Sequence, residues 1–460
     1  MSTRDDSGAG MRCWLVERRP DGSVAGGVAE GAAASVAGCD GPLVRVEAAG
    51  FNYKDALACS GHPGVAKTLP LIPGIDAAGT LVEAAAGLPA GTAVVVTGNG
   101  LGETRPGGFA TYLRPPAEAL VPRPPELSAR AAMALGTAGL TVLLALDRLA
   151  QVAAPGHREH AADEWLVTGA SGGVGMVAVA ALAAAGRTVV ACSRKPTAGP
   201  VLRALGAASV VHPDALRGDP GKPLVRGRWA GVIDTVGGTL LADVLRAVLP
   251  GGGVAAIGMA AGVDLPTTVY PFILRGVTLC GIDAATLPTQ AERAALWPRL
   301  AALWPRLCDT LPVATLALEE VGDWSAALLR GDAFGRAVVV PSARVHRHTI
   351  NLSGAWERSE RVWRRQFGQP TGIEPGDSVR LVFVTPGNAT VMLNGASLPA
   401  LGGDESRWSH DVTALLRDRN ELALTCETSA GVDGPASGRM PLPERLGHPV
   451  LEIVSRVSDP

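Results

Sequence analysis

The sequence predicts an α/β protein: a doubly wound parallel sheet, a β-rich segment before it and an all-β domain after it. Three observations lead to this fold class. A glycine-rich turn joins an apolar strand to an alanine-rich helix near residue 170, and strands and helices then alternate to about residue 341. After residue 341, alternating strands occur without amphipathic helices. Alternating strands and helices predict a parallel sheet, and short alternating strands predict a sandwich.

Composition limits the class of protein. A chain of 460 residues with 47% apolar and 18% charged residues predicts a globular protein of two or three domains. The formal charge of −2 offers no basic field for nucleic acid or an anionic membrane. Seven cysteines without a CxxC motif, and an N-terminus without an apolar signal region, predict a cytoplasmic protein with reduced thiols.

The N-terminal segment, residues 11–122, has short apolar runs between Gly, Pro and Asp clusters, which favours β-structure. Ser128 is a predicted helix cap, and a second apolar helix continues to about residue 150. The uncharged run 131–146 is too short to span a membrane and predicts a buried helix. His157 and His160 lack a third ligand nearby, so a solvated loop is expected there rather than a metal site.

The central stretch predicts a strand at 165–168, a helix at 174–185 and a strand at 188–192. Small residues occupy the i, i+2 and i+5 places of a dinucleotide fingerprint, with alanine first. Strand, turn and helix are the context that this motif requires, so backbone here is expected to approach a diphosphate. The expected contacts are Ala170, Ser171, Gly172, Gly173, Val174 and Gly175.

The end of the second strand indicates which cofactor binds. An acidic residue there would hold the ribose hydroxyl of NAD, but the chain has Ser193, Arg194 and Lys195. A hydroxyl and two cations can bind a 2′-phosphate, so NADPH is predicted. The alternative is a solvated basic turn.

Later strands are predicted at 209–211, 231–238 and 254–259, with helices between them. Ligands lie beyond the carboxyl ends of parallel strands, so Thr235, Gly237 and Gly258 are predicted to line the cofactor trough. The duplicated segment LWPRLAALWPRL places Trp297 and Trp304 on one helical face, although its two prolines obstruct a regular helix. We expect core or crevice packing for this segment.

Residues 346–457 predict a separate antiparallel β-sandwich. Asn394-Gly395 is a strong signal for a hairpin turn. Strands are predicted at 379–384, 390–393, 421–425 and 450–454.

Eight blocks in order carry a family resemblance: FNYKDALACSG, LIPGIDAAGT, VVVTGNGLGE, GTAGLTV, VTGASGGVG, DTVGG, DLPTTVYPFILRGVTLCGID and GRAVVV. They resemble the acrylyl-CoA reductase (NADPH) group of the zinc-free, quinone-oxidoreductase-like medium-chain dehydrogenases/reductases. The resemblance implies a GroES-like catalytic domain at 11–122 and 287–341, a Rossmann NADPH-binding domain at 123–286, and a homodimer.

The resemblance also implies a reaction. Zinc-dependent members of the superfamily place a Cys and a His-Glu pair where this chain has NYKD (residues 52–55) and GID (residues 74–76). No catalytic metal is therefore predicted. The implied function is NADPH-dependent reduction of the C=C bond of an α,β-unsaturated acyl thioester. One alternative is reduction of a quinone or another enone. A binding or scaffold protein that keeps the cofactor fold is an alternative of another class.

By resemblance, the FNYKD loop faces the nicotinamide, and Tyr53 is the candidate acid or oxyanion donor, supported by Asn52 and Asp55. Alternatively, Tyr53 only packs, and water or backbone supplies the proton. Thr137 is expected near the nicotinamide, or else it only starts a helix. Arg275 is expected to meet a phosphate of the cofactor or of acyl-CoA. At 105–108 the chain has RPGG, whereas the family tends to carry tryptophan before the paired glycines. The identity of the preferred acyl group is therefore not predicted.

The C-terminal segments INLSGAWE, VWRRQF, ATVMLNGASL and WSHDVTALLRDRNELALT resemble the sugar-binding jelly-roll domain of family 2 glycoside hydrolases. A carbohydrate or a protein is therefore a possible ligand of the sandwich. Two interpretations stay open for three tryptophans, buried packing or stacking on sugar rings. They are Trp356, Trp363 and Trp408.

Overall fold

The computed structural model describes residues 11–31, 39–152, 163–219, 221–286, 288–371, 373, 377–384, 387–401, 407–426 and 437–457. His157 and His160 lie outside these residues. The chain divides into two compact units, Met1–Ser342 and Ala343–Pro460. Each unit is described by itself.

The first unit contains a mainly antiparallel sheet of order β14-β15-β3-β4-β5-β7, with β6 paired to β3. The helices α1 (Tyr53–Cys59) and α8 (Val321–Arg330) pack against each other in this part of the unit. A separate hairpin is formed by β1 (Arg12–Arg18) and β2 (Val24–Glu30). The strands of the sheet are β3 (Val44–Phe51), β4 (Asp76–Leu81), β5 (Ala93–Thr97), β6 (Tyr112–Leu113), β7 (Val121–Pro122), β14 (Val313–Leu316) and β15 (Arg336–Val339).

The second sheet of this unit is parallel throughout, with the order β10-β9-β8-β11-β12-β13. The strand order reverses direction between β8 and β11, where a crevice for a ligand is expected beyond the carboxyl ends. The doubly wound parallel sheet predicted from sequence is therefore confirmed. Its strands are β8 (Glu164–Val167), β9 (Thr188–Cys192), β10 (Ala207–Val211), β11 (Trp229–Asp234), β12 (Val248–Ala256) and β13 (Thr278–Gly281). Its helices are α3 (Gly173–Ala184), α4 (Gly199–Ala204), α5 (Gly238–Leu245) and α6 (Tyr270–Arg275).

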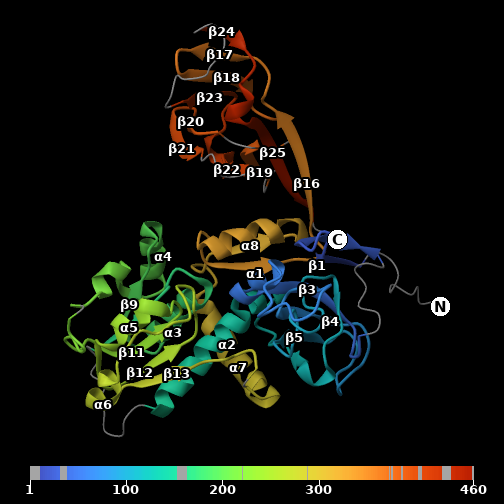
Figure 1. The fold of residues 1–460 in the computed structure, drawn as a ribbon. Helices are drawn as coiled ribbons and strands as arrows, with labels where there is room; N and C mark the ends of the chain where they lie inside the picture. Colours follow the sequence, from blue (N-terminus) through green and yellow to red (C-terminus); the bar gives the residue numbers. More distant parts are fainter. Residues whose placement is uncertain are drawn as a thin grey trace, which may run out of the picture. The chain divides into compact units, whose positions relative to one another are not determined.

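Helix α2 (Ala129–Val152) contacts both sheets of the first unit (Figure 1). Ser128 caps it as predicted, since its Oγ accepts the N–H of Ala131 at 3.1 Å. Gly136, with φ 44° and ψ −146°, divides it into two helical parts. The helix is long and apolar enough to cross a membrane, but 78% of its apolar window is buried within the fold. The prediction of a buried helix is confirmed.

The duplicated LWPRL segment forms helix α7 (Gln290–Leu303) and a short 3₁₀ turn. The expectation that its prolines obstruct a regular helix is wrong for Pro298, which lies inside α7. Trp297 is 1% exposed, and Trp304 packs against the same core, so the expected core packing is confirmed.

The second unit consists of two antiparallel sheets, of orders β16-β25-β19-β22 and β21-β20-β23-β18-β17-β24. Asn394 and Gly395, with φ of 52° and 82°, make the predicted hairpin turn between β20 and β21. Its strands are β16 (Arg344–Asn351), β17 (Trp356–Ser359), β18 (Val362–Gly368), β19 (Ser378–Val384), β20 (Ala389–Leu393), β21 (Ala396–Leu401), β22 (Arg407–Asp411), β23 (Arg419–Thr425), β24 (Ser437–Met440) and β25 (His448–Val457).

Three tryptophans form part of the core of this unit. Trp356, Trp363 and Trp408 are 0%, 1% and 7% exposed. Stacking on a sugar ring requires an open aromatic face, so this structure supports buried packing and contradicts the sugar-stacking alternative for these residues.

Candidate active site

The glycine-rich turn after β8 leads directly into α3. A Cβ atom at Gly175 would lie 2.4 Å from the carbonyl oxygen of Gly169, so only glycine allows the helix to approach the turn this closely. The N–H of Ala170 donates to the carbonyl of Cys192 at 2.9 Å, which joins the turn to the end of β9. The N-terminus of α3 therefore lies at the crevice, where its dipole favours an anion.

The basic end of β9 lies beside this turn. Ser193 Oγ donates to Ser171 Oγ at 2.9 Å, and the N–H of Lys195 donates to Ser193 Oγ at 3.1 Å. The ammonium of Lys195 donates to the carbonyl of Ala333, and burial lowers the pKa of this ammonium. Arg194 is exposed. The structure thus brings the predicted phosphate-binding residues next to the turn.

The ends of β8, β11 and β12 also meet. Asp234 Oδ1 accepts the hydroxyl of Thr168 at 2.5 Å, and Asp234 Oδ2 accepts the N–H of Gly237 at 2.8 Å. A Cβ atom at Gly258 would lie 2.2 Å from the carbonyl oxygen of Thr235. Burial raises the pKa of Asp234. The three predicted trough residues, Thr235, Gly237 and Gly258, are therefore close neighbours.

Arg275 does not join this group. Its guanidinium donates to the backbone carbonyls of Val225, Arg246 and Val248. Val248 begins β12, so Arg275 lies at the amino-terminal edge of the parallel sheet, opposite the crevice. The expectation that Arg275 meets a phosphate is corrected, because its guanidinium binds backbone carbonyls at the edge of the sheet away from the crevice.

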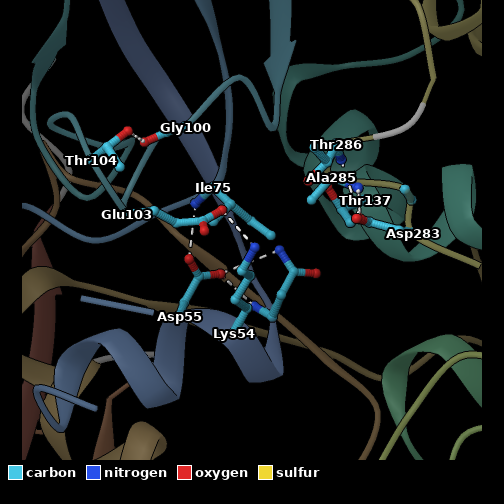
Figure 2. A network of polar contacts seen from close by, with 12 residues as sticks. Lys54, Asp55, Ile75, Gly100, Glu103, Thr104, Thr137, Asp283, Ala285 and Thr286 are labelled. Carbon is cyan, nitrogen blue, oxygen red and sulfur yellow. Dashed lines mark hydrogen bonds and ion pairs between the residues drawn. The ribbon is translucent and has the colours of Figure 1, made fainter. Parts of the chain in front are cut away.

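The FNYKD loop, residues 51–55, is held by a buried carboxylate. Asp55 Oδ2 accepts the N–H of Asn52 at 2.8 Å, and Asp55 Oδ1 accepts the N–H groups of Gly74 at 3.1 Å and Ile75 at 2.8 Å. Figure 2 shows Asp55 with Ile75 and the neighbouring Lys54. These bonds fix the start of α1, where Tyr53 is the first residue and is 42% exposed.

A second buried carboxylate, Asp76, extends the network. Its Oδ2 accepts the side-chain N–H of Asn52 and the backbone N–H of Thr137, both at 2.8 Å, and its Oδ1 accepts the hydroxyl of Thr137. Through Asp76, the structure therefore brings Thr137 to the FNYKD loop. Sequence reasoning missed Asp76 as an organising residue; a charged residue within the apolar block LIPGIDAAGT was the available signal.

Burial and proximity set the acidity of the two carboxyls. Burial, and then the charge of Asp76, raises the pKa of Asp55 to about 7. Burial also raises the pKa of Asp76. Both groups hold protons more tightly than surface aspartates do.

The donor set at this loop does not fit a zinc ion. Zinc sites are built mainly from Cys and His, and the matching positions hold Asn52 and Asp76. Each oxygen of both carboxylates already accepts an N–H or O–H group. Across the described parts of the chain, no cluster of three or more His, Cys, Asp or Glu side chains suits a metal.

Lys54 is tied to the loop that follows β5. Its Nζ lies 2.6 Å from Glu103 Oε1. Figure 2 draws both residues. Glu103 also anchors its loop through its carbonyl, which accepts the N–H of Lys67 at 3.1 Å. This loop carries the RPGG sequence, residues 105–108, so the ion pair joins the FNYKD loop to the RPGG segment.

Comparisons with known proteins identify the family. The chain matches the family models described as zinc-binding dehydrogenase, over residues 173–302, and alcohol dehydrogenase GroES-like domain, over residues 39–125. The acrylyl-CoA reductase AcuI of Ruegeria pomeroyi is 40% identical over 298 residues, which are 64% of this chain and 88% of that protein. The putative quinone oxidoreductase YhfP of Bacillus subtilis is 39% identical over 302 residues, 65% of this chain and 90% of that protein.

A solved structure adds a likeness in fold. The crystal structure of Escherichia coli K-12 YhdH with bound NADPH has a TM-score of 0.64 and 38% identity, and it covers 71% of this chain and 99% of that one. The chain therefore belongs to the quinone-oxidoreductase-like family of medium-chain dehydrogenases/reductases, with a GroES-like and a Rossmann part.

Proposed function

We propose that this protein uses NADPH to reduce the C=C bond of an α,β-unsaturated acyl thioester similar to acrylyl-CoA. One observation carries the proposal. The buried network around Asp55 and Asp76 fixes an exposed Tyr53 at the head of α1, with no zinc-ligand set beside it. This arrangement suits proton donation to a reduced double bond better than Lewis-acid activation of an alcohol.

NADPH fits the residues around the turn. The N-terminus of α3 suits the diphosphate, and Ser193, Arg194 and Lys195 suit a 2′-phosphate. The relative from E. coli binds NADPH, which supports this choice. When bound, the cofactor supplies a hydride equivalent to the β-carbon of the substrate.

The chain's own residues complete the reaction. Charge develops on the thioester oxygen as the β-carbon is reduced, and donors near that oxygen stabilise it. Tyr53 gives its hydroxyl proton, either to this oxygen or to the α-carbon. Asn52 and Asp55 orient the loop, while Thr137 contacts the nicotinamide side of the site.

The runner-up substrate is a quinone or another enone, which the similarity to the putative quinone oxidoreductase supports. A binding or scaffold role is not favoured, because the relatives are named as reductases or oxidoreductases. The test measures NADPH oxidation with acryloyl-CoA, crotonyl-CoA and a small quinone in parallel. Turnover of a thioester supports the proposal, turnover of the quinone alone supports the runner-up, and no turnover refutes both.

We also propose that the enzyme works in the cytoplasm as a homodimer. Strand β13 forms one edge of the parallel sheet, and the segment before it carries large apolar side chains that are 46–78% exposed. A second copy would cover this surface. Its side chains are Met259, Val263, Val269, Tyr270, Ile273 and Leu274. Ile273→Asp should shift the mass measured by light scattering from dimer to monomer, and a wild-type monomer would contradict the proposal.

A further inference from the structure

Arg336 opens strand β15, and its guanidinium is buried where several segments of the first unit meet. The residue is 4% exposed. Its Nε donates to the carbonyl of Ala134 at 2.8 Å, and its Nη2 to that of Met133 at 3.3 Å. Its Nη1 donates to the carbonyl of Phe51 at 3.0 Å and to Oδ1 of Asn52 at 3.2 Å. The guanidinium therefore joins α2 to the FNYKD loop.

The aliphatic part of the same side chain contacts the cofactor turn. A Cβ atom at Gly173 would lie 2.6 Å from Cδ of Arg336, so the first residue of α3 packs directly on the arginine. The neighbouring Gly335 donates its N–H to the carbonyl of Ser171 at 3.3 Å. One side chain thus contacts both the turn that suits the diphosphate and the loop that presents Tyr53.

The geometry requires arginine rather than only a positive charge. Burial lowers the pKa of the guanidinium, while the charges of Asp76 and Asp55 act in the opposite direction. A lysine would keep the charge but has one nitrogen, which cannot reach four acceptors lying in different directions. The planar guanidinium holds these acceptors at fixed positions relative to one another.

We propose that Arg336 is a positioning residue for the reduction, which holds the Tyr53 loop in place against the cofactor turn. The inference rests on the proposed function, in which Tyr53 donates the proton. In this role the guanidinium acts through the backbone of Phe51 and the side chain of Asn52 and takes no part in making or breaking bonds. Without it, buried carbonyls and the side-chain oxygen of Asn52 lose their donors, and the loop loosens.

The experiment compares Arg336→Gln and Arg336→Lys with Arg12→Gln in the full chain. Arg12 is a matched control, because it is 3% exposed and pairs with Glu30 and Glu319 away from the site. In Arg336→Gln, kcat should fall at least tenfold, while the Kd for NADPH from fluorescence titration stays within threefold. The lysine variant should lose less activity, and Arg12→Gln should keep its kcat.

Hydrogen exchange gives a readout that does not depend on turnover. Without cofactor, amide exchange in residues 51–56 should be at least tenfold faster in Arg336→Gln than in the wild type. The increase in exchange rate should be smaller but measurable in Arg336→Lys, and Arg12→Gln should exchange at the wild-type rate. Unchanged exchange at 51–56 would overturn the proposal. An NADPH Kd at least tenfold weaker with kcat preserved would also overturn it, by making Arg336 a direct cofactor ligand.

The same variants still test the proposal if Arg336→Gln does not fold or if the wild-type protein shows no turnover. If Arg336→Gln does not fold, the smaller changes expected of Arg336→Lys decide the proposal, and unchanged exchange at 51–56 in that variant overturns it. If the wild-type protein turns over no thioester or quinone, the proposed function fails. Exchange at 51–56 and the Kd for NADPH still decide whether Arg336 holds the loop.

Discussion

Asn52 connects the charged groups of the candidate site. Its side-chain nitrogen donates to Asp76 at 2.8 Å and to Asp55 at 3.3 Å, and its side-chain oxygen accepts from Arg336 at 3.2 Å. Both ends of the amide are therefore bound to protein groups. Asn52 orients the loop, and the neighbouring Tyr53, the proposed proton donor, is 42% exposed.

Replacement of the tyrosine tests this division of roles. Tyr53→Phe keeps the ring but removes the hydroxyl, so kcat should fall at least tenfold, about 1.4 kcal/mol of barrier, with a small change in KM. Steady-state NADPH oxidation measures both constants. Tyr112→Phe, in strand β6, is the control and should behave as wild type. An unchanged kcat in Tyr53→Phe would assign the proton to water or backbone.

The cations at the end of β9 are expected to select the cofactor. The double variant Arg194→Ala/Lys195→Ala should weaken NADPH binding at least tenfold and leave NADH binding within threefold, because only NADPH carries the 2′-phosphate. Fluorescence titration with each cofactor gives both affinities. Arg187→Ala is the control, since this guanidinium stacks on Trp165, 5.3 Å from the ring centre. Equal losses for both cofactors would refute the phosphate assignment.

The buried carboxyls predict how stability depends on pH. The pKa of Asp55 is about 7 in the folded protein, whereas an unfolded aspartate has about 3.9. Between these values the folded state binds more protons, so the free energy of unfolding should fall as pH rises from about 4 to about 7. The raised pKa of Asp76 acts in the same direction.

Urea denaturation at several pH values in this window measures the effect. Asp55→Asn should flatten the dependence, because the variant has no group that titrates at this position. Asp309→Asn, at an exposed site, should keep the wild-type slope. Equal slopes for wild type and Asp55→Asn would contradict the assignment.

At the scale of elements, α2 is organised around one glycine. Gly136 has φ 44°, a left-handed value that glycine adopts without strain, and it interrupts the helix just before Thr137. The interruption directs the N–H of Thr137 toward Asp76 at 2.8 Å. A Cβ atom at Gly136 would lie 2.5 Å from Asp76 Oδ2.

Gly136→Ala should therefore destabilise the protein by about 1–3 kcal/mol, because it adds backbone strain and pushes on a buried carboxylate. Urea denaturation gives the change in the free energy of unfolding. Gly27→Ala is the control, since nothing lies within 4 Å of its added Cβ. If the two variants were equally stable, the interruption at Gly136 would not be required by the fold.

At the scale of the whole molecule, the two units have separate cores. The core of the second unit is built from its own residues, and the relatives align with about two thirds of the chain. Deleting residues 343–460 should leave kcat and KM within twofold of the full-length values, measured on folded protein. A loss of tenfold or more would show that the second unit takes part in the reaction.

The sequence by itself determined the features that depend on neighbouring residues. The order of strand, turn, helix and strand follows from hydrophobic period and glycine placement, and the observed elements lie within a few residues of the predicted ones. The basic residues at the end of β9 and the absence of Cys and His in the 52–55 and 74–76 segments can likewise be read directly from the sequence. The hairpin at Asn394 is equally local, because it needs only two residues with positive φ.

Only the tertiary structure decided which distant residues meet. Asp76, Thr137 and Arg336 come from separate segments. No local pattern shows that Asp76 and Arg336 meet Asn52, or that Thr137 meets Asp76. Arg275 shows the same limit, because the edge of a parallel sheet that a side chain reaches depends on the path of the chain after each strand. Burial then changes the chemistry of the carboxyls that meet, and burial is a property of the assembled fold.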